Sequence, residues 1–259
     1  MTTEAMKREI HLTGKDLMGM VQLRPQDVGK YAIVPGPRER ADSLVKRLKS
    51  PLKNFSFMEY TMHTGDYEGT KITAINGGRF SPDTAITTEI LCNAEVKAMI
   101  RIGSCGALRE DIKIGDIIVI DSAIPGEGVT QYYTNPKNEP KADPKLTAAL
   151  FEVAQLSGLK THKGKIWTTD ALLRETNDLI NSVISKNAIA VDMVTSAFLT
   201  ICNFYKIPAA AICAVSDNIV TGDMGFIAPS YYMAESALIK IALDLIDKLE
   251  GRQIKKGMF

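Results

Sequence analysis

The most constraining feature of this sequence is a repeated alternation of short apolar runs with longer segments whose apolar residues recur at helical spacing. Strands are expected over residues 31–34, 70–76, 98–102, 116–123, 162–168, 188–192 and 209–215. Helices are expected over residues 38–48, 84–93, 145–158, 175–186, 194–205 and 230–249. Strands that alternate with helices in this way are typical of α/β proteins, so the sequence predicts an α/β fold.

The composition limits the domain organisation and the kinds of partner. Of the 259 residues, 45% are hydrophobic, which is enough for one large core, so we expect a single domain over residues 1–259. The 31 Lys and Arg residues nearly balance the 30 Asp and Glu residues, so no chain-wide positive charge attracts nucleic acid or an acidic membrane. A small-molecule partner is therefore expected.

Neither export nor metal binding is indicated by the sequence. The polar N-terminal stretch MTTEAMKREI has no apolar signal region, and no apolar run reaches the ~18 residues of a membrane-spanning helix, so we expect a cytoplasmic protein. The cysteines are widely spaced in apolar surroundings, as expected of reduced core residues, and they are Cys92, Cys105, Cys202 and Cys213. Because the chain has no CxxC or paired-histidine motif, no metal site is expected.

Three predicted strand ends each combine glycine with arginine. They are YAIVPGPRERA with Gly36 and Arg40, INGGRFSPDTA with Arg79, and IRIGSCGAL with Arg101 and Ser104. Glycine lets a ligand approach backbone N–H groups, and a guanidinium binds an oxyanion. One such turn is common in loops without function, but three in one domain favour an anion site, with phosphate as the first candidate. The stretch 126–144, rich in Gly, Pro, Asn and Lys, is expected to form a loop over this site.

One carboxylate also follows a buried strand. In AAAICAVSDN, a fully apolar run leads into Ser216, Asp217 and Asn218. Ligands of open α/β sheets bind at the carboxyl ends of strands, so Asp217 is a candidate site residue. Its alternative role is to cap a turn or a helix.

The motifs VPGPRERA, RIGSCGA, IAVDM and ICAVSDN occur in the order seen in the nucleoside phosphorylase-I superfamily, which contains the purine nucleoside and uridine phosphorylases. The chain resembles this family from IHLTGKDL near its start to its last long helix. The resemblance implies a three-layer α/β/α domain with a central mixed sheet. It also implies a homo-oligomer, either a trimer or a dimer-based hexamer, with phosphate as co-substrate and no metal or organic cofactor.

The resemblance also assigns site residues. Phosphate binding is implied for Gly36, Arg40, Arg101 and Ser104, and for Arg79, whose alternative is an ordinary solvated loop residue. Nucleoside binding is implied for His11, which would reach the sugar in a neighbouring subunit or else be a plain exposed residue, and for Met193 and Asp192. Asp217 is implied to be the catalytic acid, which favours purines because uridine phosphorylases typically lack this aspartate.

Two positions depart from the family pattern. The family usually has Glu-Met-Glu, whose second glutamate binds the ribose hydroxyls, whereas this chain has Asp192, Met193 and Val194. Met58 stands where relatives often have an arginine donated to phosphate across a subunit interface. Either the sugar is unusual, another group such as Asp192 substitutes, or activity is weak.

The sequence therefore predicts a pentosyltransferase that releases a free base and a pentose 1-phosphate from a nucleoside, with purines favoured over uridine. Two alternatives stay open. One is a hydrolytic nucleosidase of the same fold, which would not need the arginine-lined anion site. The other is a degenerate, non-catalytic nucleoside-binding protein.

Overall fold

The structure is a computed structural model, and it describes residues 10–254. The helices are α1 (Gly14–Met20), α2 (Arg38–Val45), α3 (Ser81–Asn93), α4 (Pro144–Leu156), α5 (Asn177–Ile184), α6 (Thr195–Phe204) and α7 (Pro229–Leu249), with short 3-10 turns η2 (Pro25–Asp27), η3 (Thr130–Tyr132) and η4 (Leu172–Arg174). The strands are β1 (Tyr31–Pro35), β2 (Lys49–Phe57), β3 (Tyr60–Tyr67), β4 (Thr70–Ile75), β5 (Ala98–Ala107), β6 (Ile117–Gly126), β7 (Thr161–Thr169), β8 (Ala188–Asp192), β9 (Ala209–Asn218) and β10 (Asp223–Met224).

These strands form one mixed ten-stranded sheet in the order β10-β9-β6-β7-β8-β5-β1-β4-β3-β2. Strand β5 runs parallel to β1 and to β9, and its last residues pair antiparallel with β8. Because β5 pairs with both β8 and β9, the five strands β5, β9, β6, β7 and β8 close on themselves. The ends of β5, β8 and β9 are thereby held next to one another.

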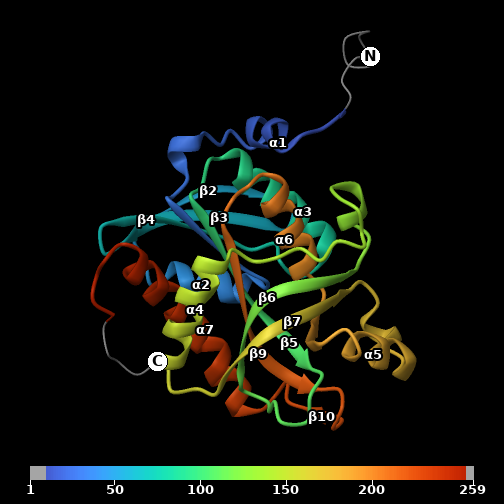
Figure 1. Ribbon diagram of the computed structural model, residues 1–259. Helices are drawn as coiled ribbons and strands as arrows, with labels where there is room; N and C mark the ends of the chain where they lie inside the picture. The colour runs from blue at the N-terminus through green and yellow to red at the C-terminus, as the bar shows by residue number, and fades with distance from the viewer. Residues whose placement is uncertain (1–9, 255–259) are drawn as a thin grey trace.

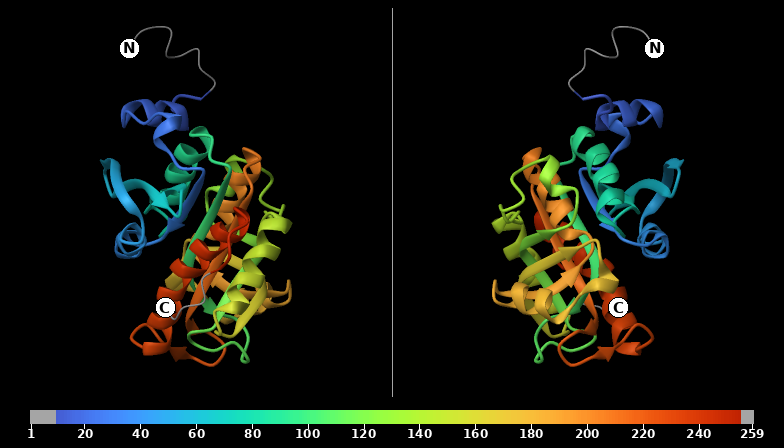
Figure 2. Two further views of the ribbon diagram at one scale, coloured as in Figure 1. Left: turned by 90° about the vertical axis from the view of Figure 1, so that its left-hand side faces the viewer. Right: turned by 90° about the vertical axis from the view of Figure 1, so that its right-hand side faces the viewer.

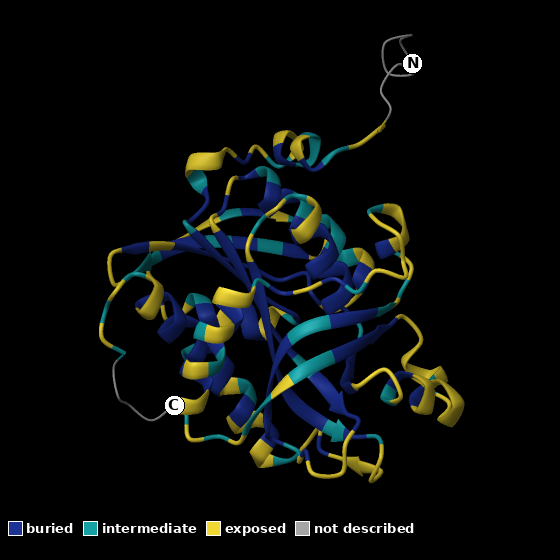
Figure 3. Cartoon of the chain, viewed as in Figure 1, coloured by how far each residue is buried: buried dark blue, intermediate teal, exposed yellow. Residues whose placement is uncertain are grey.

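Helices cover both faces of the sheet, which gives the expected three-layer α/β/α arrangement. Helices α2, α4 and α7 lie on one face, and α1, α3 and α6 lie on the other (Figures 1 and 2). Each face has its own apolar core, one including Leu44, Leu150 and Leu238 and the other including Leu91 and Phe198. The central strands β1, β5 and β9 are buried, whereas α5 and the edge strand β2 are largely exposed (Figure 3).

Two strands that carry site motifs run further than the sequence predicts. Strand β5 continues through the GSCG stretch to Ala107, and β9 continues through Asp217 to Asn218. The prediction that both strands end at these motifs is wrong, because the two strands pair with each other in parallel along this whole length, with one irregularity between Cys105 and Gly106. The motif side chains therefore project from paired strands rather than from free turns.

The segment 126–144 packs away from the main cavity. Thr130 contacts Thr200 of α6 at 3.0 Å between hydroxyl oxygens, and the Tyr133 hydroxyl donates to Glu89 of α3 at 2.8 Å. Among residues 10–254, none from this segment lines the main cavity described below, so the expectation that it covers the site is wrong. The four cysteines are buried and free, as expected. Within the described part of the chain, none of the helices is long and apolar enough to span a bilayer.

Candidate active site

A cavity of about 360 Å³ that carries most of the predicted residues lies where β5, β8 and β9 meet the turns that follow β1 and β4. Eight predicted site residues line it: Gly36, Arg40, Arg79, Arg101, Ser104, Asp192, Met193 and Asp217. His11 is exposed and is not among the lining residues. The fold therefore brings the three glycine–arginine motifs and the Asp217 carboxyl to one place.

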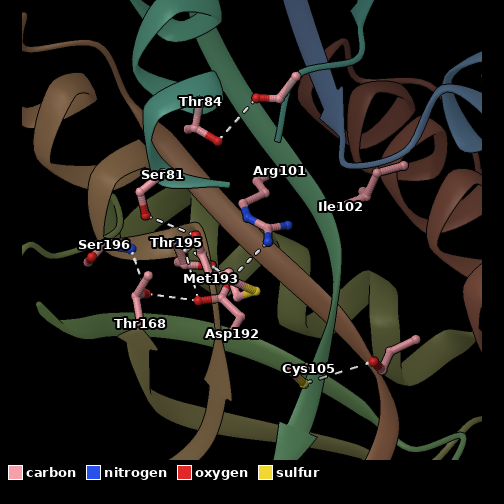
Figure 4. A network of polar contacts seen from close by, with 12 residues as sticks. Ser81, Thr84, Arg101, Ile102, Cys105, Thr168, Asp192, Met193, Thr195 and Ser196 are labelled. Atoms are coloured by element: carbon pink, nitrogen blue, oxygen red, sulfur yellow. Dashed lines mark hydrogen bonds and ion pairs between the residues drawn. The ribbon is translucent and has the colours of Figure 1, made fainter. Parts of the chain in front are cut away.

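Arg101 is the most deeply buried cation of the cavity, with 3% of its surface exposed. Its Nη2 donates to Asp192 Oδ2 at 2.8 Å (Figure 4), while Nε and Nη1 are buried and find no hydrogen-bond partner within residues 10–254. A buried donor without a partner is costly, so these two nitrogens favour an acceptor that arrives from the cavity. An oxyanion fits because it accepts charge-assisted hydrogen bonds.

Glycine at position 103 is what gives the Arg101 guanidinium its place. A Cβ atom at Gly103 would lie 1.9 Å from Arg101 Nη1 and 2.6 Å from Cζ. The small residue of the GSCG stretch thus makes room for the cation of its own strand. This role differs from the one predicted from the sequence, in which such glycines let a ligand approach the backbone.

Arg40 is the second buried cation, and it is also tethered. Its Nη1 donates to the Ile102 carbonyl at 3.0 Å, and its Nε and Nη2 donate to Glu235 Oε1 at 3.1 and 2.5 Å. The Ile102 carbonyl belongs to β5, so this hydrogen bond ties the helix after the first glycine turn to the strand that carries Arg101. Both arginines therefore face one cavity in fixed positions.

Asp192 is engaged entirely by protein groups. Besides Arg101, it accepts hydrogen bonds from the Thr168 hydroxyl at 2.8 Å and from the Thr195 hydroxyl and backbone N–H at 2.6 and 3.1 Å (Figure 4). Its carboxylate thus orients Arg101 and caps the start of α6. That Asp192 contacts a nucleoside stays a prediction.

Asp217 lies on β9 opposite Gly106 of β5. Its Oδ1 accepts a hydrogen bond from the Ser216 hydroxyl at 2.7 Å, and a Cβ at Gly106 would approach Oδ2 to 2.9 Å. Burial raises the pKa of Asp217, and the Ser216 hydrogen bond opposes this only in part. The carboxyl is therefore easier to protonate than an ordinary aspartate.

Glu175 is a cavity residue that sequence reasoning missed. It follows η4, lines the same cavity as Asp217, and has a buried Oε1 with no hydrogen-bond partner in the described part of the chain. Burial first, and the charge of Asp217 second, raise the pKa of Glu175 to about 7. The sequence places Glu175 at the start of a helix, where acidic residues are common, but α5 begins only at Asn177. The one sequence signal that could have marked Glu175 as a site residue is that it comes shortly after the end of a buried strand, β7.

Part of the cavity wall is apolar. Val191, Met193 and Val194 contribute to it, and Val194, which directly precedes α6, is buried. Arg79 lies on the exposed rim, with its guanidinium 5.4 Å from the centre of the Phe80 ring. The cavity thus has a cationic end at Arg101 and a carboxyl-bearing end at Asp217, which lies opposite Gly106 further along β5, and its wall includes apolar side chains.

Seven Arg, Asp and Glu side chains line the cavity: the arginines Arg40, Arg79 and Arg101, and the carboxyls Glu175, Asp192, Asp217 and Glu235. If all were ionised, the wall would carry one negative charge in excess. Among residues 10–254, no cluster of three His, Cys, Asp or Glu side chains could hold a metal ion.

A three-layer α/β/α fold with a buried arginine and several carboxyls lining one cavity defines a candidate small-molecule site that can receive an anion. Residues 30–247 match the model of the Phosphorylase superfamily, and the chain belongs to this family. It is 30% identical over 219 residues to a uridine phosphorylase from Thermococcus kodakarensis, covering 79% of each chain. It is 32% identical over 183 residues to a purine nucleoside phosphorylase of the DeoD type from Brevibacillus brevis, covering 70% of this chain and 77% of the relative.

The fold is also similar to that of a solved structure. Purine nucleoside phosphorylase from Toxoplasma gondii, in complex with immucillin-H, superimposes with a TM-score of 0.81 at 25% identity, covering 89% of this chain and 95% of that one. The resemblance stated from the motifs is thus confirmed at the level of family and fold.

Proposed function

We propose that this protein is a nucleoside phosphorylase, which uses inorganic phosphate to cleave the N-glycosidic bond of a nucleoside, with purines favoured over uridine. The observation that carries the proposal is the buried Arg101, which has two unpartnered nitrogens and lines the same cavity as Asp217. The relatives named above as phosphorylases of purine nucleosides and of uridine support it.

Phosphate would bind at the cationic end of the cavity. Arg101 would donate to it through the free nitrogens, with Arg40, Ser104 and the Gly36 turn beside it. Because Asp192 and Glu235 already hold the two guanidiniums in place, little reorganisation is needed when the anion binds. Positioning of this kind lowers reaction barriers by several kcal/mol.

The base would lie at the opposite, carboxyl-bearing end. The sugar would then lie between the phosphate and the base, against the apolar part of the cavity wall. Cleavage of the glycosidic bond leaves the electron pair on the base while positive charge develops on the sugar ring. A nearby phosphate stabilises the positive charge. The protonated Asp217 would deliver a proton to purine N7, and burial of this carboxyl favours its protonated form.

Several finer points belong to the same proposal. Phosphate is a co-substrate, no organic cofactor or metal takes part, and the enzyme acts in the cytoplasm as a trimer or a dimer-based hexamer. The large exposed apolar side chains Ile10, Leu12 and Met20 near the N-terminus support self-association. In such an assembly, the exposed His11 would reach a neighbouring subunit's sugar.

The experiment is to incubate the pure protein with inosine, adenosine and uridine, with and without phosphate, and to measure base release. We expect release that depends on phosphate and is faster for a purine nucleoside. Release of equal rate without phosphate would show a hydrolytic nucleosidase instead. No release from any nucleoside would show a non-catalytic binding protein.

A further inference from the structure

The inference concerns Glu175, a carboxyl that the mechanism above does not use. Glu175 comes from the segment after β7, whereas Asp217 comes from β9, and the two line one cavity. Oε1 of Glu175 is buried and has no hydrogen-bond partner in residues 10–254. The Glu175 side chain also has no ion-pair partner among these residues, unlike Asp192 and Glu235, which pair with arginines. A half-buried carboxylate without a donor is unfavourable in its charged form.

The charge of the whole cavity favours a retained proton. With three arginines and four carboxyls, the wall is one negative charge in excess when every group is ionised. Phosphate binding adds further negative charge. Asp192 and Glu235 are ion-paired with arginines, which leaves Glu175 and Asp217 as the cavity carboxyls without an ion-pair partner among residues 10–254.

We propose that Glu175 and Asp217 form one acid unit that holds a single shared proton near neutral pH, and that this proton is the one given to the departing base. The inference deepens the proposed function and rests on it. Glu175 keeps the unit protonated, and Asp217, which lies opposite Gly106 of β5, is the member that gives up the proton. A retained proton agrees with the raised pKa of Glu175, which is caused by burial and by the charge of Asp217.

The proton balance of the step is complete. A phosphate oxygen forms a bond to the anomeric carbon as the carbon–nitrogen bond breaks, and the electron pair of that bond passes to the base. The shared proton moves to a ring nitrogen of the base, which leaves both carboxyls charged. Solvent then returns one proton to the pair, and the pentose 1-phosphate loses one to solvent.

The first test is the pH dependence of kcat/KM for Glu175→Gln relative to wild type, with inosine and phosphate as substrates. Dividing the two profiles removes the ionisation of phosphate and of the nucleoside. The glutamine cannot hold the proton, so Asp217 would lose it at lower pH. We expect the ratio of variant to wild type to fall at least tenfold between about pH 5 and about pH 8. A ratio that is constant with pH would show a merely structural role and would overturn the proposal.

Asp178→Asn is the matched control because it also removes a carboxyl near Glu175, but from the exposed first turn of α5 outside the cavity. Its ratio to wild type should stay within about twofold at every pH, as for an ordinary surface substitution. A pH-dependent ratio equal to that of Glu175→Gln would assign the effect to the segment rather than to the cavity carboxyl, and would contradict the proposal.

The second test does not require turnover. The ¹³C carboxyl resonance of Glu175 is titrated in the unliganded wild type and in Asp217→Asn. We expect a midpoint of about 7 in the wild type and a lower midpoint in the variant, which lacks the neighbouring charge. A wild-type midpoint near the ordinary glutamate value of 4.5, or one that Asp217→Asn leaves unchanged, would refute the pair.

The two tests separate the inference from the proposed function. A coupled titration in a protein that releases no base from any nucleoside would retain the pair and reject the phosphorylase. Phosphate-dependent base release in a protein whose two carboxyls titrate independently would retain the phosphorylase and reject the pair.

Discussion

At the residue scale, the site is organised by carboxylates that each serve a different purpose. Asp192 and Glu235 lie against arginines and fix them, whereas Glu175 and Asp217 have no cation beside them among the described residues. A carboxylate paired with an arginine stays charged, and an unpaired buried one tends to hold a proton. The same side-chain chemistry therefore supplies orientation at one end of the cavity and acidity at the other.

Asp217→Asn should affect base release much more than phosphate binding. We expect base release from inosine to slow by about 10²–10⁴-fold, because general acid catalysis contributes on that scale. The KM for phosphate should change less than about threefold, since Arg40 and Arg101 make no hydrogen bond to Asp217 among the described residues. Steady-state kinetics with each substrate varied in turn measures both. Equal losses in turnover and in phosphate affinity would contradict the acid role.

The apolar part of the cavity wall, which includes Val194, predicts weak discrimination between ribose and 2′-deoxyribose. Val194 cannot accept a hydrogen bond, and the oxygens of Asp192 are engaged by Arg101, Thr168 and Thr195. Without a carboxylate on the sugar hydroxyls, we expect kcat/KM for 2′-deoxyinosine to lie within about fivefold of that for inosine, which corresponds to about 1 kcal/mol.

Val194→Glu is the gain-of-function test of this wall, with Val194→Leu as an apolar control. The new carboxylate should raise the preference for inosine over 2′-deoxyinosine by about tenfold, whereas leucine should leave the preference unchanged. If the wild type already prefers inosine over 2′-deoxyinosine by about a hundredfold, another acceptor binds the sugar hydroxyls and the prediction is wrong. This measurement on the wild type does not require that the variants fold.

At the scale of elements, the sequence predicts the inner strands and their helices well and the outer strands poorly. The bounds of β8 are as predicted, and α7 begins one residue earlier than predicted. Apolar periodicity finds such elements because both have buried faces. The hairpin β2–β3 was missed because β2 is an exposed edge strand that contains Pro51, so it lacks the apolar alternation of a half-buried strand.

The same reasoning explains which site residues were found. Arg40 and Arg101 belong to local motifs with glycine, and a local pattern is visible in one sequence. Glu175 has no such motif, since its character comes from burial and from Asp217, which is distant along the chain. That proximity exists only once β7 and β9 belong to one sheet. Likewise, the strands continue past Ile102 and Val215 because β5 pairs there with β9 and β8, and β9 also pairs with β10.

Strand β5 itself yields a test of how the anion site is built. Gly103→Ala would place Cβ within 1.9 Å of Arg101 Nη1, so the guanidinium must move. We expect the KM for phosphate to rise at least tenfold, because displaced donors no longer match the anion. Gly19→Ala in α1 is the control, since its Cβ would meet nothing within 4 Å. This control should retain the wild-type KM and gain helix stability of about 0.5–1 kcal/mol. An unchanged phosphate KM in Gly103→Ala would remove Arg101 from the anion site.

At the scale of the whole molecule, the cavity is assembled from distant parts of the chain. Its wall extends from Gly36 after β1 to Glu235 in α7, and Arg40 joins these two regions through Glu235. The strands between them close on themselves through β5 and β9. An unfolded chain cannot present these groups together, so phosphate should bind the native state alone and oppose global unfolding.

Phosphate should therefore raise the melting temperature. At a concentration about 100-fold above its Kd, a ligand that binds only the native state adds about 2.7 kcal/mol to the free energy of unfolding. For a chain of this size, that corresponds to a rise of roughly 5–10 °C, measured by scanning calorimetry. Sodium chloride at matched ionic strength is the control for screening of surface charge. Arg101→Lys keeps a cation opposite Asp192 but loses the planar donor set, so phosphate should stabilise this variant much less. Equal stabilisation by chloride, or an undiminished phosphate effect in Arg101→Lys, would show that the anion acts on the surface and does not occupy the cavity.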